Sequence, residues 1–497
     1  MPDDLSVVQS PPEKALLTEL SSAIERLLPA LETFTKFEGP DPAAHRSIWK
    51  SELEETLPET GAGADEVLRI LEEVVIPNGL RTGHPGFSGW VTTMPPTVPT
   101  AASLAATLSA PQRWWASPGN LLEALALDWL RDLLELSPEH QGVFISGGAV
   151  ANLICLGAAR QSAGERLGFD PSQAGVGQLL EPRVYAGANV HHVVTRALAI
   201  LGLGQHSLVE LRPTDDGMID VGELEERIRA DRAAGATPIA IVASAGDVNT
   251  GKIDPLPQLM EAATRHQVWL HVDGAYGAFG VLDERTKPLF GDWRQVDSVA
   301  VDPHKWLAAP VGCGAAFVRD RDLLGRTFTL EPADYLSGAA PGEADLGSPF
   351  EELGYEFQDF SVDQSSPSRG LVVWALLKEI GAEGMRQRVG RHLDCARQVA
   401  RRIAAEPDLE LLAEPVLSIC CFRFRPAGMG DGPDLDALNE RVLKAVWARG
   451  RTTPSTTRVD GRLSIRPCFI NPRTTLADAD ALVDEVLAVA RAGSIAP

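Results

Sequence analysis

Short apolar runs alternate with helical patterns across the middle of the chain, from Gly142 to Arg319. Several of the runs are apolar throughout, which is typical of strands buried on both faces. The candidate strands are GVFI, RVYAG, LVELR, PIAIVAS, VWLHVD, SVAVD and GAAFVR. With helices between them, these strands predict an α/β fold with a mostly parallel sheet. Because open α/β sheets bind ligands at the carboxyl ends of their strands, we expect functional residues directly after the runs.

The segments on either side of this core predict further units. SPGNLLEALALDWLRDLLEL has apolar residues at helical spacing after a Ser-Pro start, which predicts an amphipathic helix to about Leu136. Towards the C-terminus, LSICCFRFRP and GRLSIRPCFI predict antiparallel strands on either side of a helix. We therefore expect a helical arm over residues 1–77, a large domain over 78–370 and a small α+β domain over 371–497.

Composition and charge narrow the class of protein. The chain has 497 residues and a formal net charge of −23, which argues against nucleic acid or an anionic membrane as a partner. No basic and apolar leader and no apolar stretch of membrane-spanning length is present, so we expect a cytoplasmic protein. The six cysteines form no CxxC pair, which favours buried free thiols over zinc or redox sites.

Four signals for chemistry follow predicted strands. Lys305 stands after SVAV in DPHKW, and Asp273 ends VWLHVD before the small residues of GAYGA. SGGAVANL opens a helix with free backbone N–H groups, which predicts an anion site, and His191 follows RVYAGANV. Taken singly, these features are also typical of a solvated loop lysine, a helix N-cap, a tight turn and a core histidine. Together they meet the needs of pyridoxal phosphate, which requires a lysine, an anion at its ring nitrogen and donors for its phosphate.

At this point the sequence resembles the group II pyridoxal-phosphate-dependent decarboxylases, which include aromatic-L-amino-acid, histidine and glutamate decarboxylases. The resemblance covers about Asn78 to the C-terminus and implies a fold-type-I enzyme. The segments that carry it are HPGFSGW, ASPGNLLE, SGGAVANL, VHHVVTRALAILGLG, DGMID, SAGDVNTGKIDPL, HVDGAYG, VDSVAVDPHKW, DYLSG and IRPCFINPRTT.

The resemblance implies a role for each matching residue. Lys305 would form the Schiff base with pyridoxal 5'-phosphate, Asp273 would pair with the ring nitrogen, and His191 would stack on the ring. Tyr335, in DYLSG, matches the mobile-loop tyrosine that returns a proton to the substrate carbon after CO2 leaves. The other implied contacts are Gly148, Ala149 and His304 at the phosphate, Ala275 at the ring, and Thr93 and Arg466 at the substrate carboxylate.

Two segments depart from the family pattern. Ala149-Val150-Ala151 stands where the family usually has Ser-Glu-Ala, and Gly246-Asp247-Val248 stands where it often has Gly-Thr-Thr. Both changes remove a hydroxyl near the cofactor. Phosphate binding would then rest on backbone N–H groups, His304 and a residue of a partner subunit.

These observations predict the decarboxylation of an L-amino acid to the amine and CO2 by a homodimer with its site at the subunit interface. Trp90, Trp114 and Trp115 favour an aromatic or bulky side chain, although core packing is as good a reason for tryptophans, and Gln112 and Arg113 suit a polar or acidic one. One alternative is an oxidative deaminase on the same scaffold that yields an aldehyde. Another is a non-catalytic homologue that acts as a binding protein.

Overall fold

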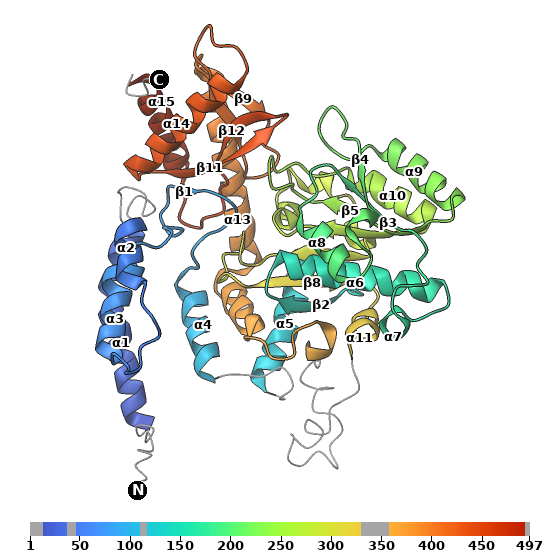
Figure 1. Ribbon diagram of the computed structural model, residues 1–497, viewed down its shortest axis with the longest axis horizontal. Coiled ribbons are helices and arrows are strands. Elements are labelled where there is room, and N and C mark those ends of the chain that lie inside the picture. The colour runs from blue at the N-terminus through green and yellow to red at the C-terminus, as the bar shows by residue number, and fades with distance from the viewer. Residues whose placement is uncertain (1–12, 37–45, 110–116, 330–356, 493–497) are drawn as a thin grey trace.

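The computed structural model describes residues 13–36, 46–109, 117–329 and 357–492 (Figure 1). Its largest sheet has seven strands in the order β2-β8-β7-β6-β5-β3-β4. The strands are β2 (Gln141–Ile145), β3 (Pro182–Gly187), β4 (Leu208–Leu211), β5 (Thr237–Ser244), β6 (Trp269–Asp273), β7 (Ser298–Val301) and β8 (Gly314–Val318). Each of them coincides with one of the predicted apolar runs.

The large sheet is mostly parallel, as predicted. β4, β3, β5, β6 and β7 run parallel to one another, and β8 pairs antiparallel with both β7 and β2. The carboxyl ends of β5, β6 and β7 therefore meet at one edge of the sheet. This is the edge at which open α/β sheets bind ligands.

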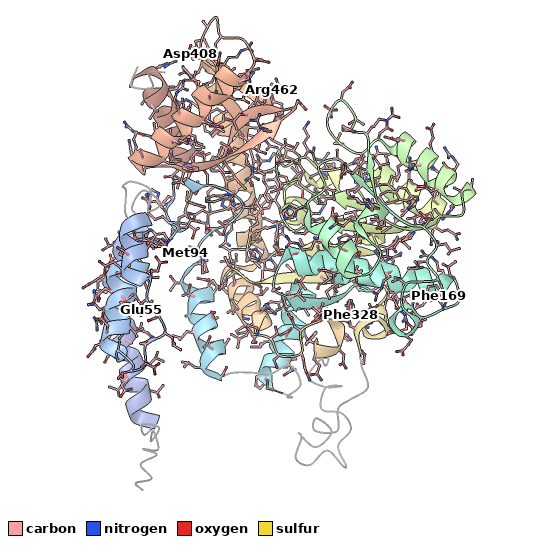
Figure 2. All side chains as sticks on the ribbon, viewed as in Figure 1. Glu55, Met94, Phe169, Phe328, Asp408 and Arg462 are labelled. Atoms are coloured by element: carbon pink, nitrogen blue, oxygen red, sulfur yellow. The ribbon has the colours of Figure 1, made fainter. Side chains whose placement is uncertain are left out.

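Helices cover both faces of this sheet, which explains why its strands are apolar throughout. One apolar cluster joins the sheet to α6 (Gly148–Arg166), α8 (Val193–Ile200) and α11 (Leu323–Phe328). Phe169 and Phe328 pack at the margin of this cluster (Figure 2). The opposite cluster joins the sheet to α5 (Pro118–Leu133), α9 (Val221–Ala233), α10 (Leu256–His266) and α13 (Arg369–Ala405).

A second sheet of five strands lies beside the large one, in the order β1-β11-β12-β10-β9. Its strands are β1 (Phe87–Ser88), β9 (Leu409–Ala413), β10 (Cys421–Phe424), β11 (Thr453–Val459) and β12 (Arg462–Arg466). The antiparallel pairing of β10 with β12 agrees with the sequence pattern, and α14 (Pro433–Arg449) is the predicted helix between them. α15 (Leu476–Arg491) follows β12. β1, β9 and β11 were not predicted; β1 has only two residues, and β11 is largely polar. The parallel pairing of β1 with β11 carries the segment around Trp90 onto this sheet.

The first helices, α1 (Glu13–Lys36), α2 (Arg46–Leu53) and α3 (Ala64–Ile70), stand beside α4 (Thr97–Ser109) on one side of the molecule (Figure 1). Within the described ranges, no helix is both long and apolar enough to cross a bilayer. All six cysteines are buried and free, as expected. The division of the chain into three units and the cytoplasmic location stay predictions.

Candidate active site

A cavity of about 490 Å³ lies where the carboxyl ends of β2, β5, β6 and β7 face the loops of the second sheet. Nine of the residues that the sequence singled out line it: Trp90, Gly148, Ala149, His191, Asp273, Ala275, His304, Lys305 and Arg466. These residues come from segments up to 376 positions apart, as the hydrogen bond between Arg466 and Trp90 illustrates. The fold therefore gathers the predicted groups around one space.

Lys305 lies in the turn after β7 and carries the primary amine of the cavity. Its Nζ is 2.9 Å from Oδ2 of Asp302, and its backbone N–H donates to the Asp302 carbonyl at 2.9 Å. The Asp302 carboxylate is buried, and among the described residues its Oδ1 has no hydrogen-bond partner. Asp302 was not predicted as a functional residue, although it directly follows a buried strand, which is the signal that indicated Asp273.

Asp273 ends β6 and turns its carboxylate into the cavity. Its Oδ1 accepts the backbone N–H of Ala275 at 3.1 Å, and its Oδ2 accepts Nδ2 of Asn152 at 3.2 Å. No helix begins at Asp273, so the N-cap alternative is wrong; the next helical turn, Ala278–Leu282, starts further on with Gly277 as its cap. One donor on each oxygen therefore holds the carboxylate in place.

The start of α6 provides donors for an anion. Gly147 caps the helix with φ at 142°, a conformation that favours glycine, and the first backbone N–H groups have no intrahelical acceptor. A Cβ at Gly148 would lie 2.8 Å from Oδ2 of Asp302 and 3.1 Å from Cβ of Ala275, so only glycine leaves this space open. His304 lies against the turn and donates Nδ1–H to the Cys313 carbonyl at 2.7 Å. Ser146, which the sequence analysis did not single out, also lines the cavity and adds a hydroxyl near Ala149.

His191 forms part of the cavity wall and is half-buried. Burial lowers the pKa of its imidazole because a cation is poorly solvated there, and the negative charge of Asp273 opposes this effect only in part. Its Nδ1 accepts the backbone N–H of Val193 at 3.3 Å, which leaves the other ring nitrogen to carry the proton. The ring is thus a flat, neutral surface at neutral pH.

Trp90 and Arg466 form the other end of the cavity. Arg466 is only 3% exposed, and its guanidinium donates to the backbone carbonyls of Trp90 at 2.7 Å, of Asn249 at 3.5 Å and of Val248. No carboxylate of the described residues lies within ion-pair distance of it. The indole of Trp90 is 52% exposed, and its backbone has φ at 49°, held by the Ser455 hydroxyl and by Arg466. A strained backbone that hydrogen bonds hold on two sides is typical of a residue at a functional site.

Some of the expected residues lie elsewhere. Thr93 is buried outside the cavity lining, and its hydroxyl donates to the Met94 carbonyl at 3.5 Å. Asp247, which replaces the family's hydroxyl, does line the cavity, but it binds its own loop by accepting the backbone N–H groups of Asn249, Thr250 and Lys252 at 2.8–2.9 Å. Tyr335 and the segment Gln112-Arg113-Trp114-Trp115 lie outside the described residues.

Comparison with known proteins gives the class to which this site belongs. The conserved domain of pyridoxal-dependent decarboxylases matches residues 49–425. An aromatic-L-amino-acid decarboxylase of Bacillus atrophaeus is 30% identical over 454 residues, which cover 90% of this chain and 90% of the relative. An L-2,4-diaminobutyrate decarboxylase of Rhizobium meliloti (strain 1021) is 28% identical over 444 residues, covering 88% and 84% of the two chains.

Solved structures agree in fold. The structure of Oryza sativa TDC with PLP and tryptamine superposes with a TM-score of 0.85 at 22% identity, covering 97% of this chain and 99% of that chain. This chain belongs to the pyridoxal-dependent decarboxylase family. It is a pyridoxal-phosphate-dependent amino-acid decarboxylase, a carboxy-lyase.

The inner end of the cavity fits pyridoxal phosphate on its own geometry. The glycine turn at the start of α6 leaves a space that a Cβ would fill, and the first backbone N–H groups of the helix face it without intrahelical acceptors. An amine and a second carboxylate, those of Lys305 and Asp273, line the same cavity. A group with an anionic end, a basic ring nitrogen and an aldehyde matches this donor set.

Proposed function

We propose that the chain decarboxylates an L-amino acid with an aromatic or bulky neutral side chain, giving the amine and CO2. The observation that carries this proposal is the composition of the cavity wall at the Trp90 end. Trp90 offers a broad indole surface there, and Val91 and Val248 add apolar surface. An aromatic or bulky apolar side chain would bury its surface against this wall.

The charges of the wall favour a neutral substrate side chain. An acidic amino acid carries two carboxylates, whereas Arg466 is the one arginine among the described residues that line the cavity. A basic side chain would need a carboxylate, but the one nearest this end, Asp247, already accepts hydrogen bonds from its own loop. We therefore assign Arg466 to the α-carboxylate that every amino acid shares.

The remaining roles follow from the positions of the side chains. Pyridoxal phosphate supplies an aldehyde that binds amines and a ring that accepts the electrons of the bond to the departing carboxylate. In this proposal the N–H groups of Gly148 and Ala149, with His304, bind its phosphate, and Asp273 holds a proton on its ring nitrogen. His191 and Ala275 would bound the ring, and Lys305 would provide the amine, with Oδ2 of Asp302 2.9 Å from its Nζ.

Incubating the purified enzyme and its cofactor with each of the twenty common amino acids tests the substrate class. We expect CO2 release to be fastest with tryptophan, tyrosine or phenylalanine, because their rings bury the largest apolar area against Trp90. Amine, aldehyde and peroxide are measured in the same samples. Preference for aspartate, glutamate or a basic amino acid would contradict the substrate class, and aldehyde with stoichiometric peroxide would identify the oxidative alternative.

Arg466→Met serves as the control in this experiment. Methionine keeps much of the length of the side chain but removes the charge, so we expect KM to rise about tenfold or more with every substrate, because a hydrogen-bonded ion pair with the α-carboxylate is lost. A rise confined to one substrate would instead place Arg466 at the side chain. Circular dichroism and cofactor absorbance confirm that the variant is folded and loaded.

We also propose that the enzyme is a homodimer. Large apolar side chains stay exposed on the side formed by the N-terminal helices and α4: Leu17, Leu28, Leu31, Leu53, Leu104 and Leu108. Apolar patches of this kind mark protein interfaces more often than free surface. Sedimentation at micromolar protein is expected to give about twice the chain mass of 53.2 kDa. A fully active monomer would contradict both the dimer and a site shared between subunits.

A further inference from the structure

A hydrogen-bonded series of buried polar side chains leads from Trp269 on β6 to Asp273 at the end of the same strand. Along β6, Trp269, His271 and Asp273 alternate with apolar residues, so they lie on one face of the strand, the face that packs on α6. Asn152 of α6 and Ser298 of β7 stand between them. Asn152, His271 and Ser298 are fully buried, and none of them belongs to the groups assigned so far.

The hydrogen bonds of this series have only one consistent direction. Nδ2 of Asn152 lies 2.8 Å from the Gly148 carbonyl and 3.2 Å from Oδ2 of Asp273, two oxygens that can only accept. The amide oxygen of Asn152 therefore faces Nε2 of His271 at 3.0 Å, and this ring nitrogen must carry the proton.

The proton on Nε2 of His271 fixes the direction of the remaining hydrogen bonds in this series. With Nε2 protonated in a neutral imidazole, Nδ1 of His271 accepts the hydroxyl of Ser298 at 3.0 Å. The Ser298 oxygen in turn accepts the indole N–H of Trp269 at 2.8 Å. Burial lowers the pKa of His271 to about 4, in keeping with a neutral ring. Each residue of the series then donates to the next one towards Asp273, and each of these N–H and O–H groups has an acceptor.

We infer that His271 and Asn152 are positioning residues that fix the carboxylate of Asp273, and with it the first turn of α6, in the orientation that the cofactor ring nitrogen requires. The amide of Asn152 cannot transfer a proton, so these hydrogen bonds orient the carboxylate of Asp273 and do not form a proton relay. Asn152 holds the Gly148 carbonyl as well as Asp273, and so links the phosphate turn to the ring-nitrogen contact. The inference rests on the proposed role of Asp273.

The test compares His271→Phe, His271→Gln and a control, His140→Phe. Phenylalanine keeps the ring but removes the donor, whereas the glutamine amide can still reach Asn152 with an N–H. His140 suits this control because it is buried and absent from the cavity lining, and burial lowers its pKa to about 4, in keeping with a neutral ring. Its ring nitrogens lie 3.3 Å from the Ser137 carbonyl and 3.1 Å from the Val296 carbonyl, and a neutral ring donates to only one of them.

Two quantities are measured that do not depend on turnover: the dissociation constant of pyridoxal phosphate by equilibrium dialysis, and the ¹⁵N chemical shift of the ring nitrogen in labelled cofactor. For His271→Phe we expect a dissociation constant raised about tenfold and a shift towards the unprotonated ring nitrogen. His271→Gln should stay within about threefold of wild type, and His140→Phe should change neither quantity, although it loses stability. An unchanged shift and affinity in His271→Phe would overturn the inference.

Asn152→Ala keeps the test decisive if His271→Phe does not fold. Alanine suits a helix, and this variant removes the amide N–H that Asp273 itself accepts. Its ring nitrogen is expected to lose its proton in the same way. Asp273→Asn separates the two proposals. If the cofactor ring nitrogen stays protonated in Asp273→Asn, the proposed role of Asp273 itself is refuted. If the ring nitrogen loses its proton in Asp273→Asn but keeps it in His271→Phe and Asn152→Ala, only the positioning role of His271 and Asn152 is refuted.

Discussion

Lys305→Ala is expected to lower turnover by about four orders of magnitude or more, because the variant lacks the amine that binds the cofactor aldehyde and later displaces the product from it. Substrate and cofactor should then stay bound together, which a lasting change in the visible absorbance after mixing would reveal. Single-turnover mixing with substrate measures both effects.

Lys287→Ala is the matched control for this variant. Like Lys305, Lys287 forms an ion pair, with Glu135 at 2.7 Å, but its side chain is 40% exposed and lies outside the cavity lining. We expect its activity to match wild type, since exposed ion pairs contribute little. Near-normal turnover in Lys305→Ala would show that the candidate site is wrongly placed.

Asp273→Asn is expected to lower kcat by about two to four orders of magnitude, because the protonated ring nitrogen loses its anion and accepts electrons less readily. The substitution keeps the size of the side chain, but its amide would set an N–H against the donors from Ala275 and Asn152. Steady-state kinetics at saturating cofactor separate this effect from weaker cofactor binding.

Asp254→Asn controls for the loss of a buried carboxylate. Asp254 also accepts two backbone N–H groups, those of Ser244 at 2.7 Å and Ile219 at 3.1 Å, and burial raises its pKa to about 6. It lies outside the cavity lining, so we expect lower stability with kcat close to wild type. Equal losses of kcat in the two variants would mean that Asp273 acts through the fold alone.

Local pattern was enough to predict the elements that hold the cofactor end of the site. The runs SVAV and VWLHVD are β7 and β6, and their ends place Lys305 and Asp273 at one edge of a parallel sheet. The Gly-Gly turn predicted the start of α6, and the anion site there stays a prediction. These features depend on neighbours close in the sequence, namely apolar burial on both faces and the conformational freedom of glycine.

Only the tertiary structure decided the rest. It paired β1 with β11, so that Trp90 and Arg466, 376 positions apart, share a hydrogen bond, and it left Thr93 outside the cavity. It also set Asn152 of α6 against His271 of β6. The sequence by itself therefore determined the strands of the large sheet, the helix that starts at Gly148 and the residues at the ends of these elements. Which of those residues meet depends on strand register and on the packing of the second sheet, and these are long-range contacts that no local pattern encodes.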